Sequence, residues 1–294
     1  MRLELSFSLW IFYLFWKMQP VFLSAVGWET ILRMGYNGGG SSEQRAGVWI
    51  GIGILALWMS RTHIKRILFG LFSKQSPRLE TKAHNANTDK LSKMAIYGII
   101  AGMIFILIFW SQAGLSYWVA LPYFGIYLVF CVCITRMRAE LGPPTHELHN
   151  MHPDRIMVSF MGTRKLGIRN LTITMLLSWL AYGYRTHPMP HQLEGFKIGS
   201  SLKIKEKRLV IAMVIAAVVG TFVAILFHVS LNFKYQLTRG PEYTERLQGW
   251  IIYPASIDVT ALKHMGFGFF LTMLLTILTR RFIWWSLYPV GYAV

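Results

Sequence analysis

The sequence predicts an all-α integral membrane protein, a polytopic transmembrane helical bundle of about six spans with one shorter apolar segment. Hydrophobic residues make up 54% of the 294 residues, charged residues only 15%, and the mean hydropathy is +0.41. Soluble domains usually carry about 25% charged residues, because their surface has to be solvated. Aromatic residues reach 15%, with 11 Trp, which fits helix ends that lie at the level of lipid headgroups.

The net charge is +17, from 30 Lys and Arg against 13 Asp and Glu. Such a balance often indicates nucleic-acid binding. Here the basic residues lie between apolar runs, a pattern typical of cytoplasmic loops that face anionic lipid. We therefore expect the lipid bilayer as a partner and no nucleic acid.

Six apolar segments predict the transmembrane helices, since a hydrocarbon core about 30 Å thick takes roughly 20 helical residues to cross. The pair over 94–135 is joined by three residues only, which predicts a tight helical hairpin, and the last segment is followed by Arg280 and Arg281. In chain order the segments are residues 5–25, 46–60, 94–111, 115–135, 209–231 and 262–279.

Residues 171–184 form a further apolar stretch that is too short for a regular span and fits a re-entrant or interfacial segment better. The loops beside it are both basic, with six Lys and Arg each over 136–170 and 185–208, and residues 61–93 carry eight. If the short segment dips in and returns, all three basic loops share the cytoplasmic side, as the positive-inside rule favours. Both termini are then cytoplasmic.

We expect a single transmembrane domain over residues 1–294. Residues 61–93 form a basic cytoplasmic linker, because their second half is polar and poor in apolar side chains. Polar residues concentrate over 136–208, around the short segment 171–184. This polar region is the candidate functional region.

Three histidines with a spacing of three, His146, His149 and His152, allow a metal-binding interpretation, because imidazole is a common ligand of divalent metals. On a helix, positions i, i+3 and i+6 drift by about 60° per step around the axis, so the rings fan out. Pro153 also ends a helix at this point. A bound divalent metal is therefore one alternative, and solvated or hydrogen-bonded loop histidines are the other.

Charged and polar side chains on both sides of the short segment are candidates for binding a solute. If the segment is re-entrant, the two flanks meet at its mouth and form one site. The candidates in the flanks are Arg138, Glu140, Asp154, Arg155, Arg185, His187, His191 and Glu194.

Lys17 is a further candidate, because a charge inside a span usually faces a bundle interior or a water-filled route. Gln19 and Pro20 follow it and predict a broken helix of the kind that lines transporter sites. The alternative is that the Lys17 side chain extends to the membrane interface.

The polar region resembles a family of bacterial polytopic membrane proteins known only as a domain of unknown function. The matching stretches include RAELGPPTHELHNMHPDR (138–155), GTRKLGIRNLT (162–172) and RTHPMPHQLEGFKI (185–198), and the resemblance covers nearly the whole chain. It implies an inner-membrane protein that corresponds to the C-terminal half of longer members, so that an N-terminal half or a second copy is an expected partner. The family is distantly similar to oligopeptide-type transporters, and the resemblance supplies no catalytic residues.

Three functions remain open from the sequence. The first, which we favour, is a transporter or transporter half for a small polar or charged solute, indicated by interrupted spans and the lysine within a span. The second is a membrane-embedded, metal-dependent enzyme, although no nucleophile elbow, phosphate-binding loop or HExxH motif occurs. The third is a structural or partner-binding membrane subunit.

Overall fold

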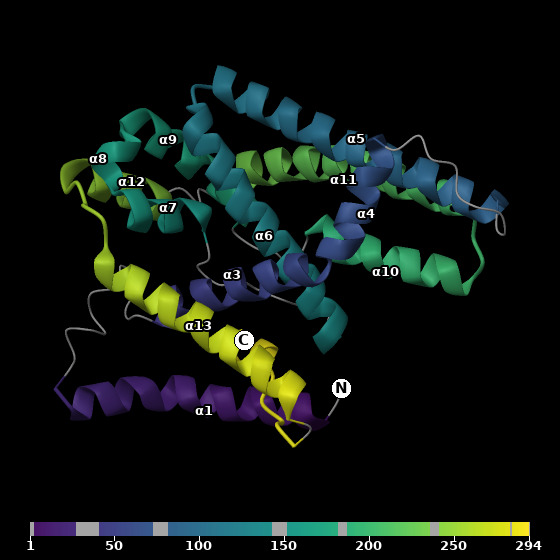
Figure 1. Ribbon diagram of the computed structural model, residues 1–294. Coiled ribbons are helices and arrows are strands. Elements are labelled where there is room, and N and C mark those ends of the chain that lie inside the picture. Colours follow the sequence, from purple (N-terminus) through teal and green to yellow (C-terminus); the bar gives the residue numbers. More distant parts are fainter. Residues whose placement is uncertain are drawn as a thin grey trace.

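The computed structural model describes residues 3–27, 41–72, 82–142, 152–181, 187–235, 241–282 and 284–293, and over these ranges the chain forms helices and turns without a β-strand (Figure 1). The prediction of an all-α protein is confirmed for these residues. The helices are α1 (Leu3–Ala25), α3 (Ser41–Met59), α4 (Arg61–Phe72), α5 (Lys82–Gln112), α6 (Tyr117–Leu141), α7 (Pro153–Met161), α8 (Thr163–Leu166), α9 (Ile168–Leu176), the 3-10 helix η1 (Leu177–Ala181), α10 (Pro188–Ser201), α11 (Glu206–Tyr235), α12 (Pro241–Ile252), α13 (Val259–Arg281) and α14 (Pro289–Ala293).

Four helices in the described part of the chain are long and apolar enough to cross a membrane. They match four predicted spans, and α5 and α6 form the predicted hairpin. The two other predicted spans are helical too, as α1 and α3 with 23 and 19 residues. Lys17, Gln19 and Pro20 in α1 and the polar first turn of α3 lower the mean hydropathy of these two helices, so they are not among the four and the count of about six spans is not confirmed. The four spans are Lys93–Gln112, Tyr117–Glu140, Lys207–Tyr235 and Val259–Arg281.

Helix α3 packs closely against α13 (Figure 1). A Cβ atom added to Gly47 would lie 1.9 Å from the Met265 carbonyl oxygen, and one added to Gly268 would lie 2.0 Å from the Gln44 carbonyl oxygen. Small residues let helix backbones approach this closely in membranes, where van der Waals contact drives association. The α3–α13 pair therefore depends on one glycine from each helix.

Helix α6 contributes to both apolar cores of the protein. Its second half, with Phe130 and Ile134, packs into a core shared with α1, α3, α13 and α14. Its first half, with Tyr123 and Phe124, packs into a core shared with α7, α9, η1 and α12. None of the apolar span residues of α5 or α11 is buried within the chain, so these two helices need lipid or another protein around them.

The C-terminal ends of α3, α6 and α13 meet at one end of the bundle. Met59 Sδ lies 3.6 Å from Arg136 Nη1 and 2.8 Å from Arg280 Nη2. We call this the basic end. The first and last helices meet there as well, since the Tyr288 hydroxyl donates to Glu4 Oε2 at 3.0 Å. The start of α1 lies at this end, whereas α14 leads away from it, because the Tyr292 hydroxyl donates to Gln44 Oε1 at 3.2 Å near the start of α3. The cytoplasmic location of both termini stays a prediction.

The short apolar segment, now α9 and η1, runs along α6. Asn170 Oδ1 accepts a hydrogen bond from the Ser116 amide at 2.9 Å, at the N-terminal end of α6. His187 Nε2 lies 2.9 Å from Cys131 Sγ, about 15 residues and some 22 Å further along that helix. The segment therefore passes from one end of α6 toward the other. These contacts do not support the predicted re-entrant hairpin, whose flanks would share one end.

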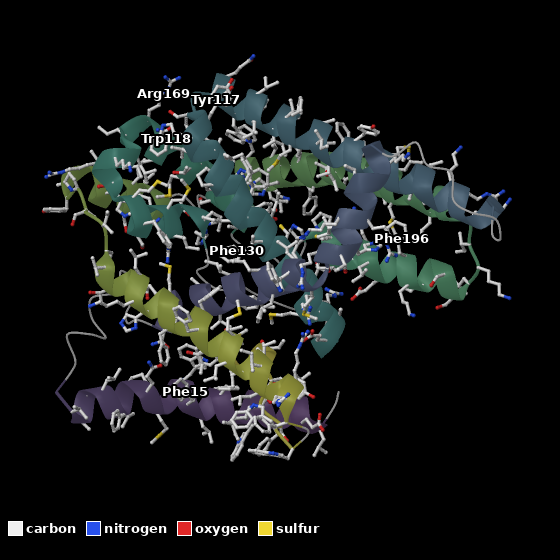
Figure 2. The ribbon with its side chains drawn as sticks, viewed as in Figure 1. Phe15, Tyr117, Trp118, Phe130, Arg169 and Phe196 are labelled. Atoms are coloured by element: carbon white, nitrogen blue, oxygen red, sulfur yellow. The ribbon has the colours of Figure 1, made fainter. Side chains whose placement is uncertain are left out.

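The position of Arg169 also shows that the short apolar segment starts at the N-terminal end of α6. A Cβ atom on Gly114, in the α5–α6 turn, would lie 2.6 Å from Arg169 Nε, and Figure 2 shows Arg169 at the same edge of the molecule as Tyr117 and Trp118. We call this edge the α9 end. The basic residues over 136–170 are therefore divided between the two ends of the bundle and do not form one loop on one side.

Candidate functional site: a buried ion pair among short helices

Short helices form the α9 end of the bundle, because glycines interrupt the chain there. Gly162 ends α7 with φ 75° and Gly167 ends α8 with φ 77°, backbone conformations that residues with a side chain rarely adopt. Helices α7, α8 and α9 have nine, four and nine residues as a result. Helix α12 packs against α9 and closes the group (Figure 1).

A buried ion pair joins two of these short helices. Arg246 Nη2 of α12 lies 3.4 Å from Asp154 Oδ2 of α7, and the two side chains are 5% and 0% exposed. The same Arg246 nitrogen lies 3.1 Å from Met175 Sδ, and its guanidinium lies 5.5 Å from the centre of the Trp250 ring. Asp154 Oδ1 has no hydrogen-bond partner within the described ranges. The pair is thus fully desolvated but incompletely satisfied.

Such a pair stabilises the fold poorly. Removing each ion from water costs roughly several kcal/mol, which the mutual attraction offsets only when the geometry is very good and the remaining hydrogen bonds are made. Here the separation is long and one Asp154 oxygen is unsatisfied. Buried ionisable groups whose protonation is perturbed by desolvation and by a specific charged partner cluster at functional sites. The Asp154–Arg246 pair is therefore the strongest candidate for a functional centre.

Two neighbours complete a charge cluster of Asp154, Arg246, His152 and Arg155. His152 is the N-cap residue of α7 and is 5% exposed. Burial, with the charges of Arg155 and Arg246, lowers the pKa of His152 to about 3, so its ring is neutral at physiological pH. Burial also raises the pKa of the Asp154 carboxyl, against the opposing effect of the two arginines. With Asp154 ionised, the cluster holds two positive charges and one negative charge.

A cavity of about 200 Å³ adjoins the cluster. Arg155, a member of the cluster, lines this cavity. Trp250, whose ring faces the Arg246 guanidinium, lines it as well. Acidic side chains of Glu43 and Asp258 line it from α3 and from the start of α13. The volume corresponds to several water molecules at about 30 Å³ each, or to one small solute.

Four of the predicted site residues form a separate cluster between α6 and α10. Arg138 Nε and Nη2 donate to the two carboxylate oxygens of Glu194 at 2.5 and 2.9 Å. His187, the N-cap residue of α10, lies against Cys131, and burial, with the nearby His191, lowers its pKa. Glu194 is 46% exposed and Cys131 is buried. These contacts attach α10 to α6, near the basic end.

The remaining predicted residues lie elsewhere. Glu140 pairs with Arg136 at 2.8 Å at the basic end. Lys17 is exposed, with its nitrogen 5.6 Å from the centre of the Tyr13 ring, so it does not reach the buried ion pair. Arg185, His146 and His149 lie outside the described residues.

The metal hypothesis stays a prediction. Among the residues that the structure describes, no three His, Cys, Asp or Glu side chains could together hold a metal ion. His152 in addition lies near two guanidinium groups, whose positive charge opposes a divalent cation.

Arg246 is the member of the charge cluster that was not predicted from the sequence, and Tyr123, which interacts electrostatically with Asp154, was not predicted either. Tyr123 lies inside a regular apolar span, and its hydroxyl donates to the Leu177 carbonyl oxygen at 3.2 Å. Arg246 follows Glu245 and is one of three basic residues in the loop that the sequence predicts over 232–261, so its immediate neighbours do not distinguish it. The signal that could have selected it is the amphipathic pattern of α12, which buries Arg246 together with Trp250, four residues later.

Fold and site together define a helical membrane protein with a buried charge cluster in a region of interrupted helices. The chain belongs to a family of unknown function (DUF6785), whose model matches residues 1–294. Comparison with curated proteins and with solved structures gave no match. The predicted membership of an uncharacterised family is confirmed, while its bacterial origin and its similarity to oligopeptide-type transporters receive no support from these comparisons.

Proposed function

We propose that the protein is a transporter, or one half of a transporter, for a small polar or charged solute, and that the Asp154–Arg246 cluster is its binding or coupling centre. The observation that carries the proposal is the complete burial of this ion pair at 3.4 Å beside a cavity.

The interrupted helices support this interpretation. Non-helical backbone among membrane helices is tolerated where protein buries it or where it lines a water-filled space. Transporters use such breaks to place backbone and side-chain polar groups at a solute site. Here the breaks at Gly162 and Gly167 separate the short helices that carry Asp154 and Met175, two neighbours of Arg246.

The charges of the cluster would allow a solute to replace Asp154 as the ion-pair partner of an arginine. Asp154 is shared between two arginines, and burial favours its protonated form. The carboxylate of a solute that also carries a positive group would bind Arg155 and compete with Asp154 for Arg246, because carboxylates pair well with guanidinium groups. Glu43 and Asp258 line the same cavity and would face the positive group. Protonation of Asp154 would then accompany solute binding and couple the two events.

Flux into proteoliposomes tests the proposal, with a panel of small acids, amino acids and short peptides as solutes. The informative variant is the double substitution Asp154→Val with Arg246→Met, which removes both charges without leaving either one buried alone. We expect solute-dependent flux in the wild type and its loss in this variant, provided that the variant elutes as a folded species in detergent. Unchanged flux in the folded variant would contradict the proposal, as would no flux and no thermal stabilisation by any solute.

A second double variant locates the site. Arg138→Gln with Glu194→Gln removes the exposed pair between α6 and α10 and leaves the buried pair intact. We expect flux to persist in this variant. Loss of flux here, with flux retained after the change at Asp154 and Arg246, would place the site at α10.

The predicted partner remains part of the proposal. An N-terminal half or a second copy would cover the exposed apolar surfaces of α5 and α11, whose span residues are not buried within the chain. An inner-membrane location with the basic end in the cytoplasm fits the positive-inside rule. Measurement of the mass of the purified protein–detergent complex would distinguish a monomer from a homo-oligomer.

A further inference from the structure

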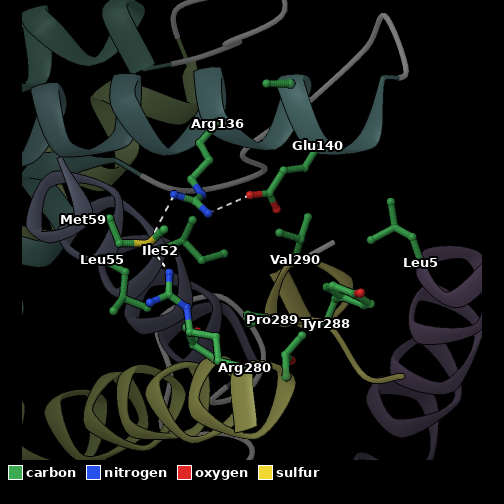
Figure 3. A pocket seen from close by; sticks show the side chains of 13 residues that line it. Leu5, Ile52, Leu55, Met59, Arg136, Glu140, Arg280, Tyr288, Pro289 and Val290 are labelled. Atoms are coloured by element: carbon green, nitrogen blue, oxygen red, sulfur yellow. Dashed lines mark hydrogen bonds and ion pairs between the residues drawn. The ribbon is translucent and has the colours of Figure 1, made fainter. Parts of the chain in front are cut away.

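A second cavity, of about 450 Å³, lies at the basic end, far from the Asp154–Arg246 pair along α6 (Figure 3). It opens between α1, α3, α6, α13 and α14. Its inner wall is apolar and its mouth is charged. The apolar wall includes Leu5, Ile52, Leu55 and Val290.

The mouth carries an excess of positive charge. Arg136 Nη2 pairs with Glu140 Oε1 at 2.8 Å, and both side chains are about one-third exposed. Arg280 makes no ion pair with any residue that the structure describes, and its Nη2 lies 2.8 Å from Met59 Sδ. A thioether sulfur is a weak acceptor for a guanidinium group with five N–H donors. Figure 3 shows Arg136 and Arg280 both directed at this sulfur, so the two cations and one acid leave one positive charge at the mouth.

The surroundings place this mouth at the depth of lipid headgroups. Arg280 lies in the last turn of α13, and Arg136 lies one turn before the end of α6. Trp284, just beyond α13, is 73% exposed, and Trp58 is 63% exposed with the Arg61 guanidinium 4.4 Å from its ring centre. Exposed tryptophans and arginines at helix ends are typical of the membrane–water interface.

We propose that this cavity is a binding site for an anionic phospholipid, with Arg280 and Arg136 as ligands of the phosphate. Arginine binds phosphate through two parallel hydrogen bonds, and basic pockets between membrane helices bind anionic headgroups in this way. The apolar wall then contacts the first part of an acyl chain. Glu140 opposes a second negative charge, so the net charge of the mouth favours a phosphodiester lipid over a phosphomonoester.

Lipid retention by the purified full-length chain tests this site, measured by native mass spectrometry after exchange into mixed micelles. The probes are phosphatidylglycerol, phosphatidylcholine, phosphatidic acid and inorganic phosphate. We expect the wild type to retain phosphatidylglycerol, and Arg280→Gln to weaken its binding by about tenfold or more, the effect of one or two charge-assisted hydrogen bonds. Arg164→Gln, which changes an arginine of α8 at the other end of the bundle, serves as the matched control and should bind as the wild type does.

Glu140→Gln tests the same site by a gain of binding. This variant should bind anionic lipid more tightly, with the largest gain for phosphatidic acid, because the opposing carboxylate is removed. It keeps the test valid if Arg280→Gln does not fold. Equal retention of phosphatidylglycerol by wild type, Arg280→Gln and Glu140→Gln would overturn the proposal. Binding of phosphatidylcholine as tight as that of phosphatidylglycerol would also overturn it. So would binding of inorganic phosphate as tight as that of the lipid, since the apolar wall would then contribute nothing.

Discussion

Replacing Arg246 by methionine would leave the Asp154 carboxyl buried and without its ion-pair partner, with the charge of Arg155 as its nearest remaining compensation. Asp154 is 0% exposed and Arg246 only 5%, so water cannot substitute for the lost partner. Breaking a buried pair on one side typically costs about 3–5 kcal/mol. Methionine fills much of the space beside Met175 and Trp250, so a cavity contributes little to this cost. We expect Arg246→Met to lower the free energy of unfolding by about that amount near pH 7.5.

The double variant should be much less affected than either single one. Asp154→Val alone removes the carboxylate that faces the buried Arg246 guanidinium, and we expect a cost of about the same size. In the double variant Asp154→Val/Arg246→Met neither member of the pair remains, and Arg155 is the one charge left in the cluster. Replacement of both members of a buried pair by apolar residues is often neutral, or stabilising by about 1–4 kcal/mol. The coupling energy of this double-mutant cycle therefore measures the desolvated charges and not the packing.

Acidification should reduce the defect of Arg246→Met. Burial raises the folded-state pKa of Asp154 above its unfolded value, and the loss of Arg246 removes a charge that opposes this rise. For an acid whose folded pKa is raised, stability is lost as the pH rises through that folded pKa, and it is regained on acidification. The variant should thus approach the wild type as the pH falls from 8 toward 5.

The protein contains its own reporter for this experiment. Its two cysteines, Cys131 and Cys133, are both buried, so a thiol-reactive fluorophore labels them when the structure opens. Unfolding in mixed SDS micelles, followed by this labelling, ranks the wild type and the three variants. A loss below about 1 kcal/mol in Arg246→Met, or costs of the two single variants that add up in the double one, would refute the buried-pair interpretation.

Three further predictions use the same labelling assay. Gly268→Leu should destabilise the α3–α13 pair by more than the roughly 1–3 kcal/mol of ordinary overpacking, because its Cβ would overlap a backbone carbonyl oxygen. Gly266→Leu on the same helix has open space and should cost little. Burial lowers the pKa of His152 to about 3 in the folded state, so the protein loses stability as the pH falls below 6.5, by about 2 kcal/mol between pH 7 and 5. His152→Gln should lack this loss. An identical response to acid in the wild type and in this variant would contradict the prediction. Arg138→Gln should cost no more than about 1 kcal/mol, since its partner Glu194 is 46% exposed, and a larger loss would show that the pair is more buried than described.

Much of the architecture could be predicted from the sequence, because long apolar runs leave few alternatives to a membrane helix. Residues 209–231, for example, lie within the regular helix α11, and the predicted hairpin connection falls at residues 113–116 between α5 and α6. The short helices were harder to predict. A glycine can lie inside a helix, as Gly220 does, or end one, and only the three-dimensional structure shows that Gly162 and Gly167 adopt positive φ.

The site could be predicted only in part. Asp154 and Arg155 were selected because they follow a histidine-rich polar stretch, but Arg246 lies 92 residues from Asp154 and no local pattern links the two. The re-entrant interpretation rested on counting lysines and arginines per loop, which assumes that each loop stays on one side. Arg138 and Arg169 belong to the same predicted loop, yet the first contacts α10 near the basic end and the second lies beside the α5–α6 turn.

The two ends of the bundle differ in how firmly they are packed, and this difference bears on mechanism. Helices α3 and α13 meet at Gly47 and Gly268 with backbone in contact, so they form a rigid pair. The short helices attach to α13 through the non-helical residues 253–258, where the Thr163 and Asp258 amides donate to the carbonyl oxygens of Ala255 and Ser159. Irregular backbone of this kind absorbs changes in φ and ψ more readily than a packed helix pair. We therefore expect a change of partner at Asp154 to move the short helices relative to a fixed α3–α13 pair.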